Sequence, residues 1–184
     1  MEKQVYADID IVDENNKPTG KTTDYFDLHE NNLCHRAANI WVIENGYVYF
    51  QVRGDNVRHP GKYDVCVGGH VDTGESGRQG AVRECIEEVG LDFSEDELGE
   101  EFIFRFKQEL NCGWFENEFR HTYFVFGDKF NFILNDEVSK LEKIKLVDLK
   151  RFYFENENKF VPNNESFYEF VFNIFEKKYN IKFN

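Results

Sequence analysis

The order of apolar and polar segments along the chain predicts several strands and a few helices. In the segment ANIWVIENGYVYFQV, two runs of β-branched and aromatic residues are separated by Asn45-Gly46. An Asn-Gly pair between two such runs is a strong signal for a two-residue hairpin turn. The pattern therefore predicts antiparallel strands near residues 38–43 and 47–52.

The polar segment RGDNVRHPGKYD, which follows the hairpin, contains Pro60-Gly61 and is expected to form a loop. Beyond it, the apolar run YDVCV predicts a short strand that leads into Gly68-Gly69. Four later runs predict further strands, at residues 102–107, 119–126, 130–134 and 143–149.

Two segments have the apolar spacing of amphipathic helices. Ser76, with Gln79 three residues later, forms the sequence of a capping box, and Gly90 is placed as the residue after a helix end. These signals predict a helix over residues 77–89. The segment NESFYEFVFNIFEKKY predicts a C-terminal helix that starts after an Asn cap. Its core-facing side is expected to contain Phe167, Phe170, Val171, Ile174 and Phe175.

The composition agrees with one folded unit. Of the 184 residues, 41% are apolar and 17% are aromatic, which is enough to bury one substantial core. Because the chain has no repeat or linker, we expect a single α/β domain over residues 1–184. No run approaches the roughly 20 apolar residues of a membrane span, and no apolar leader opens the chain. We therefore expect a soluble, cytoplasmic protein with no membrane partner.

Charge and cysteine content narrow the function classes. The net charge is -13, with 35 acidic and 22 basic residues, which argues against a nucleic-acid partner because such surfaces neutralise phosphates with Lys and Arg. A cation-dependent site suits this charge better. No CxxC pair suggests a disulfide framework or a thiolate zinc site, so buried free thiols are expected. The four cysteines are Cys34, Cys66, Cys85 and Cys112.

The predicted helix over residues 77–89 separates its side chains into two faces. Helical spacing places Glu84, Glu87 and Glu88 together on one face. Arg83 lies one turn before Glu87 and is expected to pair with it. The opposite face is expected to pack on the core and contains Ala81, Val82, Cys85, Ile86 and Val89.

A merely solvated face is one interpretation of these carboxylates, but their crowding has a cost. Glu84 and Glu88 are like charges four residues apart, and acidic groups in a last turn oppose the helix dipole by roughly 0.3–1 kcal/mol. Mg²⁺, or Mn²⁺ as a second candidate, removes both costs, since Mg²⁺ prefers carboxylate, water and phosphate oxygens. Gly68-Gly69, just before the helix, lets backbone approach a metal or phosphate because no side chain blocks the way.

The segment from Gly69 to Leu91 resembles the Nudix box. Gly69 is followed after five residues by Glu75, and after seven more by the run RECIEEVGL. This is the spacing of the family motif, with Cys85 where the family usually has a larger aliphatic residue. The resemblance implies an α/β/α sandwich around a mixed sheet and Mg²⁺-dependent cleavage of a nucleoside diphosphate derivative or another organic diphosphate.

The same resemblance implies residue roles. Glu84 and Glu88 match the principal metal ligands of the family, Glu87 is a further ligand or a base, and Glu75 is the remaining carboxylate of the box. Arg83 matches the residue that orients the glutamates. In the implied reaction, water attacks phosphorus while metal ions spread the developing charge.

A polyanionic substrate must also approach an acidic protein, so basic side chains are needed near the box. The loop before the box contains three such residues, and we expect them to act as substrate clamps. They are Arg53, Arg58 and Lys62.

Segments outside the box resemble isopentenyl-diphosphate isomerases and their hydrolase relatives within the same superfamily. The resemblance rests on TGKTTDYFDLHENNLCHRAANIWVI and WFENEF. The isomerases hold an additional metal with three histidines and two glutamates, and Glu116 or Glu118 is also a candidate base for hydrolysis here. The matching positions in this chain are His29, His35, His70, Glu116 and Glu118.

Two departures argue against isomerase activity. The isomerases use a cysteine directly before a Gly-His pair as an acid, whereas this chain has Gly68 there. By strand alternation, Cys66 points to the same side as Gly68, so Cys66 stays open as a replacement for that acid. The isomerases carry a degraded form of the glutamate run, which is complete here. A Nudix hydrolase is the leading hypothesis, while an isoprenoid diphosphate isomerase and a catalytically silent nucleotide sensor stay open. The sequence does not decide between a monomer and a homodimer.

Overall fold

The computed structural model describes residues 7–110, 113–162 and 165–184. Seven strands form a central sheet: β3 (His35–Glu44), β4 (Tyr47–Arg53), β5 (Tyr63–Val65), β6 (Val67–His70), β7 (Phe102–Glu109), β8 (Phe115–Gly127) and β9 (Val138–Lys145). Its main path is β5-β4-β3-β8-β7, with β6 added to β3 and β9 added to β4. Strands β3 and β8 run parallel, whereas β7 and β8 are antiparallel, so the sheet is mixed.

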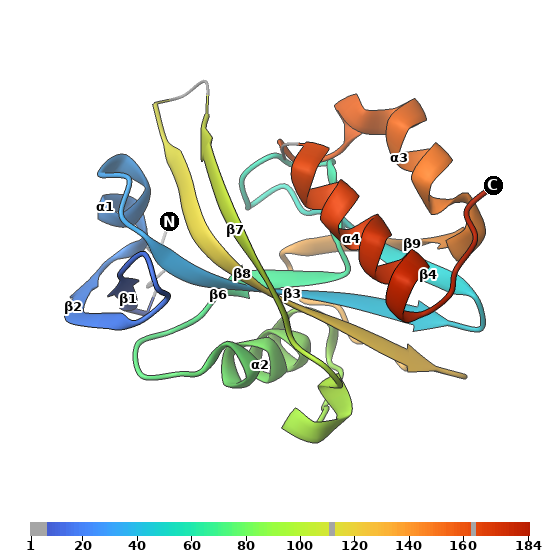
Figure 1. The fold of residues 1–184 in the computed structure, drawn as a ribbon, viewed down its shortest axis with the longest axis horizontal. Helices are drawn as coiled ribbons and strands as arrows, with labels where there is room; N and C mark the ends of the chain where they lie inside the picture. The colour runs from blue at the N-terminus through green and yellow to red at the C-terminus, as the bar shows by residue number, and fades with distance from the viewer. Residues whose placement is uncertain (1–6, 111–112, 163–164) are drawn as a thin grey trace.

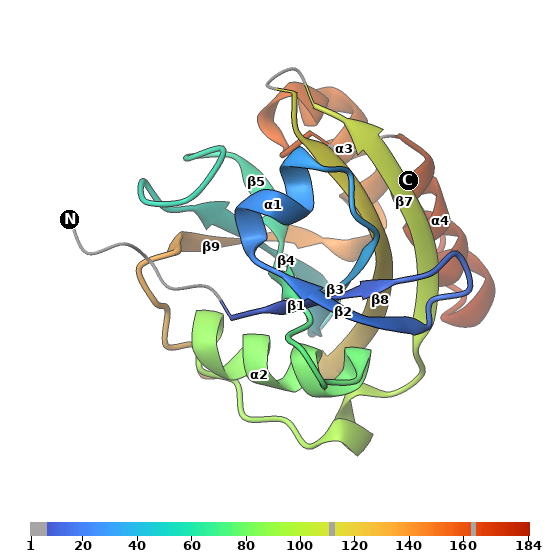
Figure 2. The ribbon, with the colours of Figure 1, turned by 90° about the vertical axis from the view of Figure 1, so that its left-hand side faces the viewer.

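The helices are α1 (Tyr25–Glu30), α2 (Gly77–Val89), α3 (Leu149–Asn156) and α4 (Glu165–Lys178). Short 3₁₀ turns occur at η1 (Glu95–Leu98), η2 (Leu146–Asp148) and η3 (Glu157–Lys159). A separate two-stranded sheet, made of β1 (Ile9–Val12) and β2 (Pro18–Thr23), lies with α1 across one end of the main sheet (Figure 2). No helix of the described residues is long and apolar enough to cross a membrane.

The helices cover the two faces of the main sheet. Helix α2 lies on one face, and α3 and α4 lie on the other (Figure 1). Strand β3 contributes side chains to the cores on both faces, because successive side chains of a strand point to opposite faces. Trp41 and Ile43 pack toward α3 and α4, while Ile40 and Val42 pack toward α2. This layering confirms the predicted α/β/α sandwich around a mixed sheet.

The predicted hairpin is confirmed. Ile43 of β3 pairs with Val48 of β4, and the connecting residues Asn45 and Gly46 have positive φ values of 48° and 79°. Such a turn needs two residues that tolerate this backbone region, which explains the Asn-Gly pair. The strands predicted at 102–107 and 119–126 are also confirmed, within β7 and β8.

The strand predicted at residues 130–134 is wrong. This segment is irregular, because its backbone bonds to the end of α2 instead of to a strand: the Ile133 amide donates to the Val89 carbonyl at 2.8 Å. Its aromatic residues Phe130 and Phe132 still pack against the core beneath α2, which accounts for the apolar pattern.

Two other strand predictions need new boundaries. The run YDVCV is split at Cys66 into β5, which pairs with β4, and β6, which pairs with β3. The strand predicted at residues 143–149 begins earlier, at Val138, and ends at Lys145, after which the chain turns into η2. The apolar residues after Lys145 belong to this turn and to the start of α3.

Helix α2 has the predicted ends but not the predicted faces. The Ser76–Gln79 capping box is present, and Gly90 closes the helix in the left-handed conformation. However, Ile86 is 47% exposed, whereas Glu88 is only 5% exposed. The helix is therefore rotated so that Glu88, and not Ile86, faces the sheet.

Helix α4 is confirmed, with Phe167, Val171, Ile174 and Phe175 buried and Phe170 partly buried against the core. The Asn cap expected before it lies outside the described residues. Free thiols are found at the buried Cys66 and Cys85 and at the half-buried Cys34, while Cys112 also lies outside the described residues. Strands β1 and β2 and helices α1 and α3 were not predicted.

Candidate active site

A cleft of about 580 Å³ opens at one side of the sheet, between strand β6, the glutamate-bearing side of α2, helix α1 and strand β8. It brings together most of the residues singled out from the sequence. Those that line it are His29, Arg53, Arg58, Gly68, Gly69, His70, Arg83, Glu84, Glu87, Glu88, Glu116 and Glu118.

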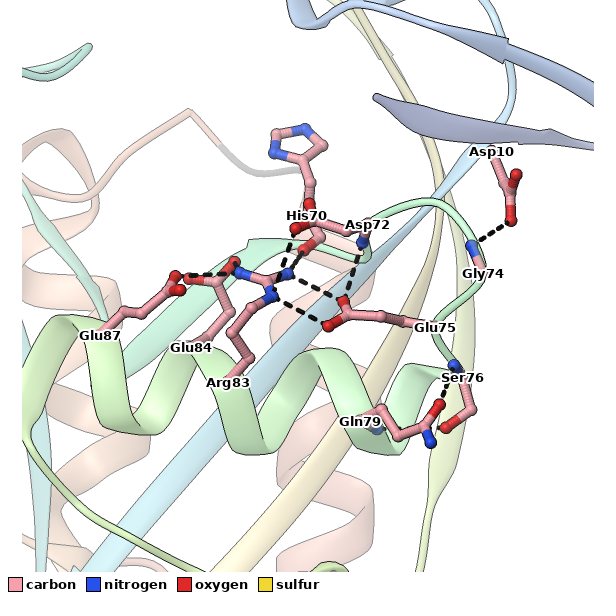
Figure 3. Close-up of polar contacts among 10 residues, drawn as sticks. All are labelled: Asp10, His70, Asp72, Gly74, Glu75, Ser76, Gln79, Arg83, Glu84 and Glu87. Atoms are coloured by element: carbon pink, nitrogen blue, oxygen red, sulfur yellow. Dashed lines mark hydrogen bonds and ion pairs between the residues drawn. The ribbon is translucent and has the colours of Figure 1, made fainter. Parts of the chain in front are cut away.

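Arg83 is the centre of the hydrogen-bond network in the box (Figure 3). Its Nε and Nη2 donate to the two carboxylate oxygens of Glu75, both at 3.0 Å. Its Nη1 donates to Glu84 at 2.8 Å and to Glu87 at 3.0 Å, which confirms the predicted contact between Arg83 and Glu87. Nη2 also donates to the His70 carbonyl at 2.8 Å. One guanidinium therefore fixes two carboxylates of α2 and the end of β6.

Gly69 is required by the position of Glu84. A Cβ atom at residue 69 would lie 2.2 Å from Glu84 Oε1, so a larger residue displaces this carboxylate. Burial raises the pKa of Glu84 to about 7, even though the charge of Arg83 acts in the opposite direction. A buried carboxylate with a raised pKa gains stability from a nearby cation.

Glu88 is buried beneath the same backbone. Its Oε2 accepts hydrogen bonds from the Gly68 amide at 3.0 Å and from Gln51 Nε2 at 3.2 Å. Burial, and next the charge of Glu84, raises the pKa of Glu88 well above its usual value. Glu87, in contrast, is more than half exposed at the cleft edge.

The five residues matched to the second metal group lie together, although they come from four elements. His29 is on α1, His35 begins β3, His70 ends β6, and Glu116 and Glu118 are on β8. Possible ligand atoms of His29, His35 and His70 lie within 4.8 Å of one another, and so do those of His35, Glu116 and Glu118. These residues are called the His/Glu group below.

Hydrogen bonds fix two imidazoles of the His/Glu group. Nδ1 of His29 donates to the Phe115 carbonyl at 2.9 Å, and Nδ1 of His35 donates to the Leu33 carbonyl at 3.1 Å. Because a carbonyl only accepts, both Nε2 atoms of the neutral rings carry lone pairs directed into the group. Burial lowers the pKa of His29 to about 4, and burial likewise lowers that of His70.

One polar atom in the His/Glu group has no hydrogen-bond partner. Nε2 of His35 is buried, and the nearest carboxylate oxygen, Oε2 of Glu118, lies 3.4 Å away. Nε2 of His29 lies 3.2 Å from Nε2 of His70, and His70 donates this hydrogen bond when its proton is on Nε2. Nε2 of His35 and Oε2 of Glu118 are opposed acceptors, which are costly unless a proton or a cation lies between them.

The three basic residues of the loop have different positions. Arg53 and Arg58 line the cleft, where Arg53 pairs with Asp64 at 2.9 Å and Arg58 pairs with Glu116 at 3.3 Å. Lys62 is not part of the cleft lining, and its ammonium donates to the Asn158 carbonyl. The structure therefore gives Lys62 no place at the site.

Three residues at the site were missed in the sequence: Arg120 and Glu137 line the cleft, and Gln51 is buried behind it, where it donates to Glu88. Arg120 pairs with Glu118 at 2.6 Å and lies two residues after it on β8, so strand alternation was an available signal. Gln51 on β4 had no local signal. Glu137 lines the cleft because the preceding backbone is bonded to α2, with the Asn135 amide donating to the Glu88 carbonyl at 3.0 Å. No local pattern marks a position that depends on such a contact.

The position of Cys66 bears on isomerase chemistry. Its side chain is fully buried in the core cluster beneath α2, and burial raises its pKa well above the usual value. It does not line the cleft, which has Gly68 at the place of the isomerase cysteine. Cys66 is therefore not placed to replace the missing acid.

Comparison with known proteins agrees with this geometry. The model of the NUDIX domain matches residues 34–170. An uncharacterized Nudix hydrolase of Clostridium acetobutylicum is 32% identical over 154 residues, which cover 78% of this chain and 72% of that protein. An isopentenyl-diphosphate Delta-isomerase of Pectobacterium atrosepticum is 31% identical over 139 residues, which cover 74% of this chain and 75% of that protein.

Nudix hydrolase 3 of Arabidopsis thaliana is 25% identical over 163 residues, and the match spans 83% of this chain but only 21% of that longer protein. Among solved structures, a protein of Deinococcus radiodurans has a TM-score of 0.62 at 18% identity, covering 86% of this chain and 93% of that chain. The family match and the arrangement of the box lead to one conclusion: the chain belongs to the Nudix family.

Proposed function

We propose that the protein is a Mg²⁺-dependent hydrolase that cleaves the diphosphate linkage of a nucleoside diphosphate derivative or another organic diphosphate. The observation that carries this proposal is the burial of Glu84 and Glu88 in one cleft wall, with their carboxylates against Gly69 and Gly68. Burial and neighbouring carboxylates raise the pKa values of both glutamates, and groups perturbed in this way within a cleft are candidates for a functional site.

The donor set fits a hard divalent cation. Oxygen ligands from Glu84, Glu87 and Glu88 are available at the cleft wall, and carboxylates with substrate phosphate oxygens are the usual ligands of Mg²⁺. When bound, Mg²⁺ supplies Lewis-acid polarisation of the phosphoryl oxygens and a more acidic water. Mn²⁺ has similar ligand preferences and is the alternative ion.

The residues of the chain have distinct tasks in this proposal. Arg83, fixed by Glu75, holds Glu84 and Glu87 in place before the substrate arrives, which removes an ordering cost from the reaction. Arg53 and Arg58 bind the anionic substrate at the cleft mouth. Glu116 or Glu118 accepts the proton of the attacking water.

The His/Glu group is proposed to hold a further divalent cation. The unpartnered Nε2 of His35 faces Glu118 at 3.4 Å, and a cation between these atoms gives both a partner. The Nδ1 atoms of His29 and His35 donate to carbonyls, which is the usual outer-shell arrangement of a metal-binding imidazole. Imidazole together with carboxylate suits Mn²⁺ or Zn²⁺ better than Mg²⁺.

A panel of nucleoside diphosphates, dinucleotides, sugar nucleotides and prenyl diphosphates, assayed with Mg²⁺ and with Mn²⁺, tests the proposal. We expect cation-dependent release of a phosphorylated product that carries one ¹⁸O atom from labelled water. The variant Glu84→Gln should lose turnover, whereas Glu155→Gln, a change at an exposed residue of α3, should not. Binding of a panel member without any turnover supports the silent sensor and overturns the hydrolase.

An isopentenyl-diphosphate isomerase is the second candidate, because all five residues of the His/Glu group converge and because one relative carries that name. Against it, Gly68 lies in the cleft and Cys66 lies in the core. Migration of the double bond in isopentenyl diphosphate, followed by proton NMR without release of phosphate, decides for the isomerase.

A further inference from the structure

Each glutamate of the His/Glu group is shared between one arginine and one histidine. Oε1 of Glu116 lies 3.3 Å from Arg58 Nη1, while its Oε2 lies 3.6 Å from His29 Nδ1. Oε1 of Glu118 lies 2.6 Å from Arg120 Nε, while its Oε2 lies 3.4 Å from His35 Nε2. Both carboxylates thus contact a guanidinium with the oxygen that points away from the imidazoles.

This arrangement balances the charge of the group without a metal ion. When both glutamates are ionised, their two negative charges are matched by the two positive charges of the guanidiniums, and the hydrogen bonds of His29 and His35 fit neutral rings. A divalent cation entering the group adds two further positive charges within a few ångströms of the guanidiniums. Because like charges repel strongly in a buried site, the two arginines lower the affinity of the group for that cation.

The two arginines differ in how firmly they are held. Arg120 has a side chain only 10% exposed, and its guanidinium lies 3.6 Å from the ring centre of Phe106 and 4.5 Å from that of Phe167. Arg58 is on the loop before the box, is 27% exposed, and lies over the ring of Trp114 at 4.7 Å. Its ion pair with Glu116 is also the longer of the two.

Arg58 is therefore the arginine that a bound anion is able to attract. It lines the cleft mouth, and a diphosphate group offers a guanidinium several charged oxygens in place of the single carboxylate oxygen of Glu116. Movement of Arg58 to the substrate takes away the guanidinium that pairs with Oε1 of Glu116. The His/Glu group then has one uncompensated negative charge, which favours a divalent cation.

We propose that Arg58 couples substrate binding to cation binding by changing partner from Glu116 to the diphosphate of the substrate. The proposal rests on the proposed function in one respect, namely that the cleft binds a diphosphate. Because coupling between two ligands is reciprocal, a cation in the His/Glu group also raises the affinity for the diphosphate by the same factor.

The test is a Mn²⁺ titration of the full chain with and without methylenediphosphonate, a diphosphate analogue that is not hydrolysed. Pulsed electron paramagnetic resonance separates the two proposed cation sites, because only an ion in the His/Glu group couples to imidazole nitrogen. In the wild type, we expect the analogue to raise the affinity of the nitrogen-coupled Mn²⁺ about tenfold, within the usual range of such couplings.

The variant Arg58→Gln should bind this Mn²⁺ about tenfold more tightly than the wild type without the analogue, and the analogue should then change its affinity by less than about twofold. Lys62→Gln is the matched control. Lys62 is a basic residue of the same loop, but it does not line the cleft and its ammonium donates to the Asn158 carbonyl, so this variant should keep the full coupling. Thermal unfolding of each variant checks that the fold is retained.

Three results overturn the inference. In the first, the Mn²⁺ affinity of the wild type does not change when the analogue is added. In the second, the Arg58→Gln variant binds Mn²⁺ no more tightly than the wild type. In the third, no sample shows Mn²⁺ coupled to imidazole nitrogen. Hydrolysis without coupling rejects this inference alone. Coupling in a protein that hydrolyses none of the diphosphate panel rejects the proposed hydrolase activity alone.

Discussion

Replacing Glu88 by Gln should make the protein more stable and less active at the same time. A single oxygen of Glu88, Oε2, accepts both hydrogen bonds, from the Gly68 amide at 3.0 Å and from Gln51 Nε2 at 3.2 Å. The carbonyl oxygen of Gln fits the same position and keeps both bonds. The substitution therefore removes a buried charge and changes little else.

The size of the effect follows from the surroundings of the carboxylate. Glu88 is 5% exposed, and no basic side chain among the described residues pairs with it. Burying a carboxylate costs several kcal/mol, and hydrogen bonds to a charged group return about 1.5–3 kcal/mol each. With the repulsion from Glu84 added, we expect Glu88→Gln to raise the free energy of unfolding by about 2 kcal/mol in the absence of divalent cations.

The raised pKa of Glu88 determines how the stability difference between the variant and the wild type changes with pH. Burial raises the pKa of Glu88 in the folded state, so the folded state holds a proton that the unfolded chain has already lost. The free energy of unfolding of the wild type then falls as pH rises from the unfolded pKa, near the usual value of 4.5, toward the folded pKa. The advantage of the variant should be near zero at pH 4 and should grow as pH rises from there to pH 8.

Urea unfolding in EDTA at several pH values measures this difference, and Mg²⁺-dependent turnover measures the loss of activity. Added Mg²⁺ should stabilise the wild type more than the variant, because ligand binding to the native state adds to its stability. A Glu88→Gln protein that is less stable than the wild type at pH 8 in EDTA, or a difference that does not change with pH, refutes the reasoning.

Three further changes test other parts of the structure. Gly69→Ala pushes Glu84 out of place and should lower turnover roughly a hundredfold while changing the free energy of unfolding by less than about 1 kcal/mol; normal turnover would contradict the contact. Glu101→Gln should cost about 1 kcal/mol at pH 7 in urea unfolding, because Glu101 accepts hydrogen bonds from His121 and Tyr123 that lower its pKa to about 2. That cost should shrink as pH falls from 4.5 toward 2, where the carboxylate becomes protonated. Ile86→Ala should lower the free energy of unfolding by less than about 1 kcal/mol, since Ile86 is half exposed. A larger loss would indicate that Ile86 faces the core, as expected from the sequence.

The parts of the fold that the sequence predicts are those controlled by local signals. The Asn45-Gly46 turn and the Ser76–Gln79 capping box each depend on residues close together in the chain, and both are present. The segment 130–134 has an apolar pattern typical of a strand, but its backbone is bonded to the end of α2. A pattern records which side chains are buried and not which backbone groups pair, so it cannot tell these two cases apart.

The rotation of α2 was mispredicted for a related reason. A helical wheel assigns the core side to the most apolar stripe, which included Ile86 and excluded Glu88. In the structure, the Gly68 amide and Gln51 give Glu88 the partners that make its burial tolerable. These partners come from β6 and β4, so only the assembled sheet shows why a glutamate takes the place of an isoleucine.

The charge of the cleft gives a reason to expect that cations fill the two candidate sites when the substrate binds. Eight carboxylates and four arginines line the cleft, so a fully ionised site has an excess of four negative charges and repels a diphosphate. Without cations, burial keeps part of these carboxylates protonated, as the raised pKa values of Glu84 and Glu88 indicate. Each cation that enters must displace such protons, and two divalent ions supply the four positive charges that the site lacks. If the cleft binds an anionic substrate, we therefore expect it to bind only together with cations, so the arrangement of carboxylates and arginines matters for substrate binding as well as for chemistry.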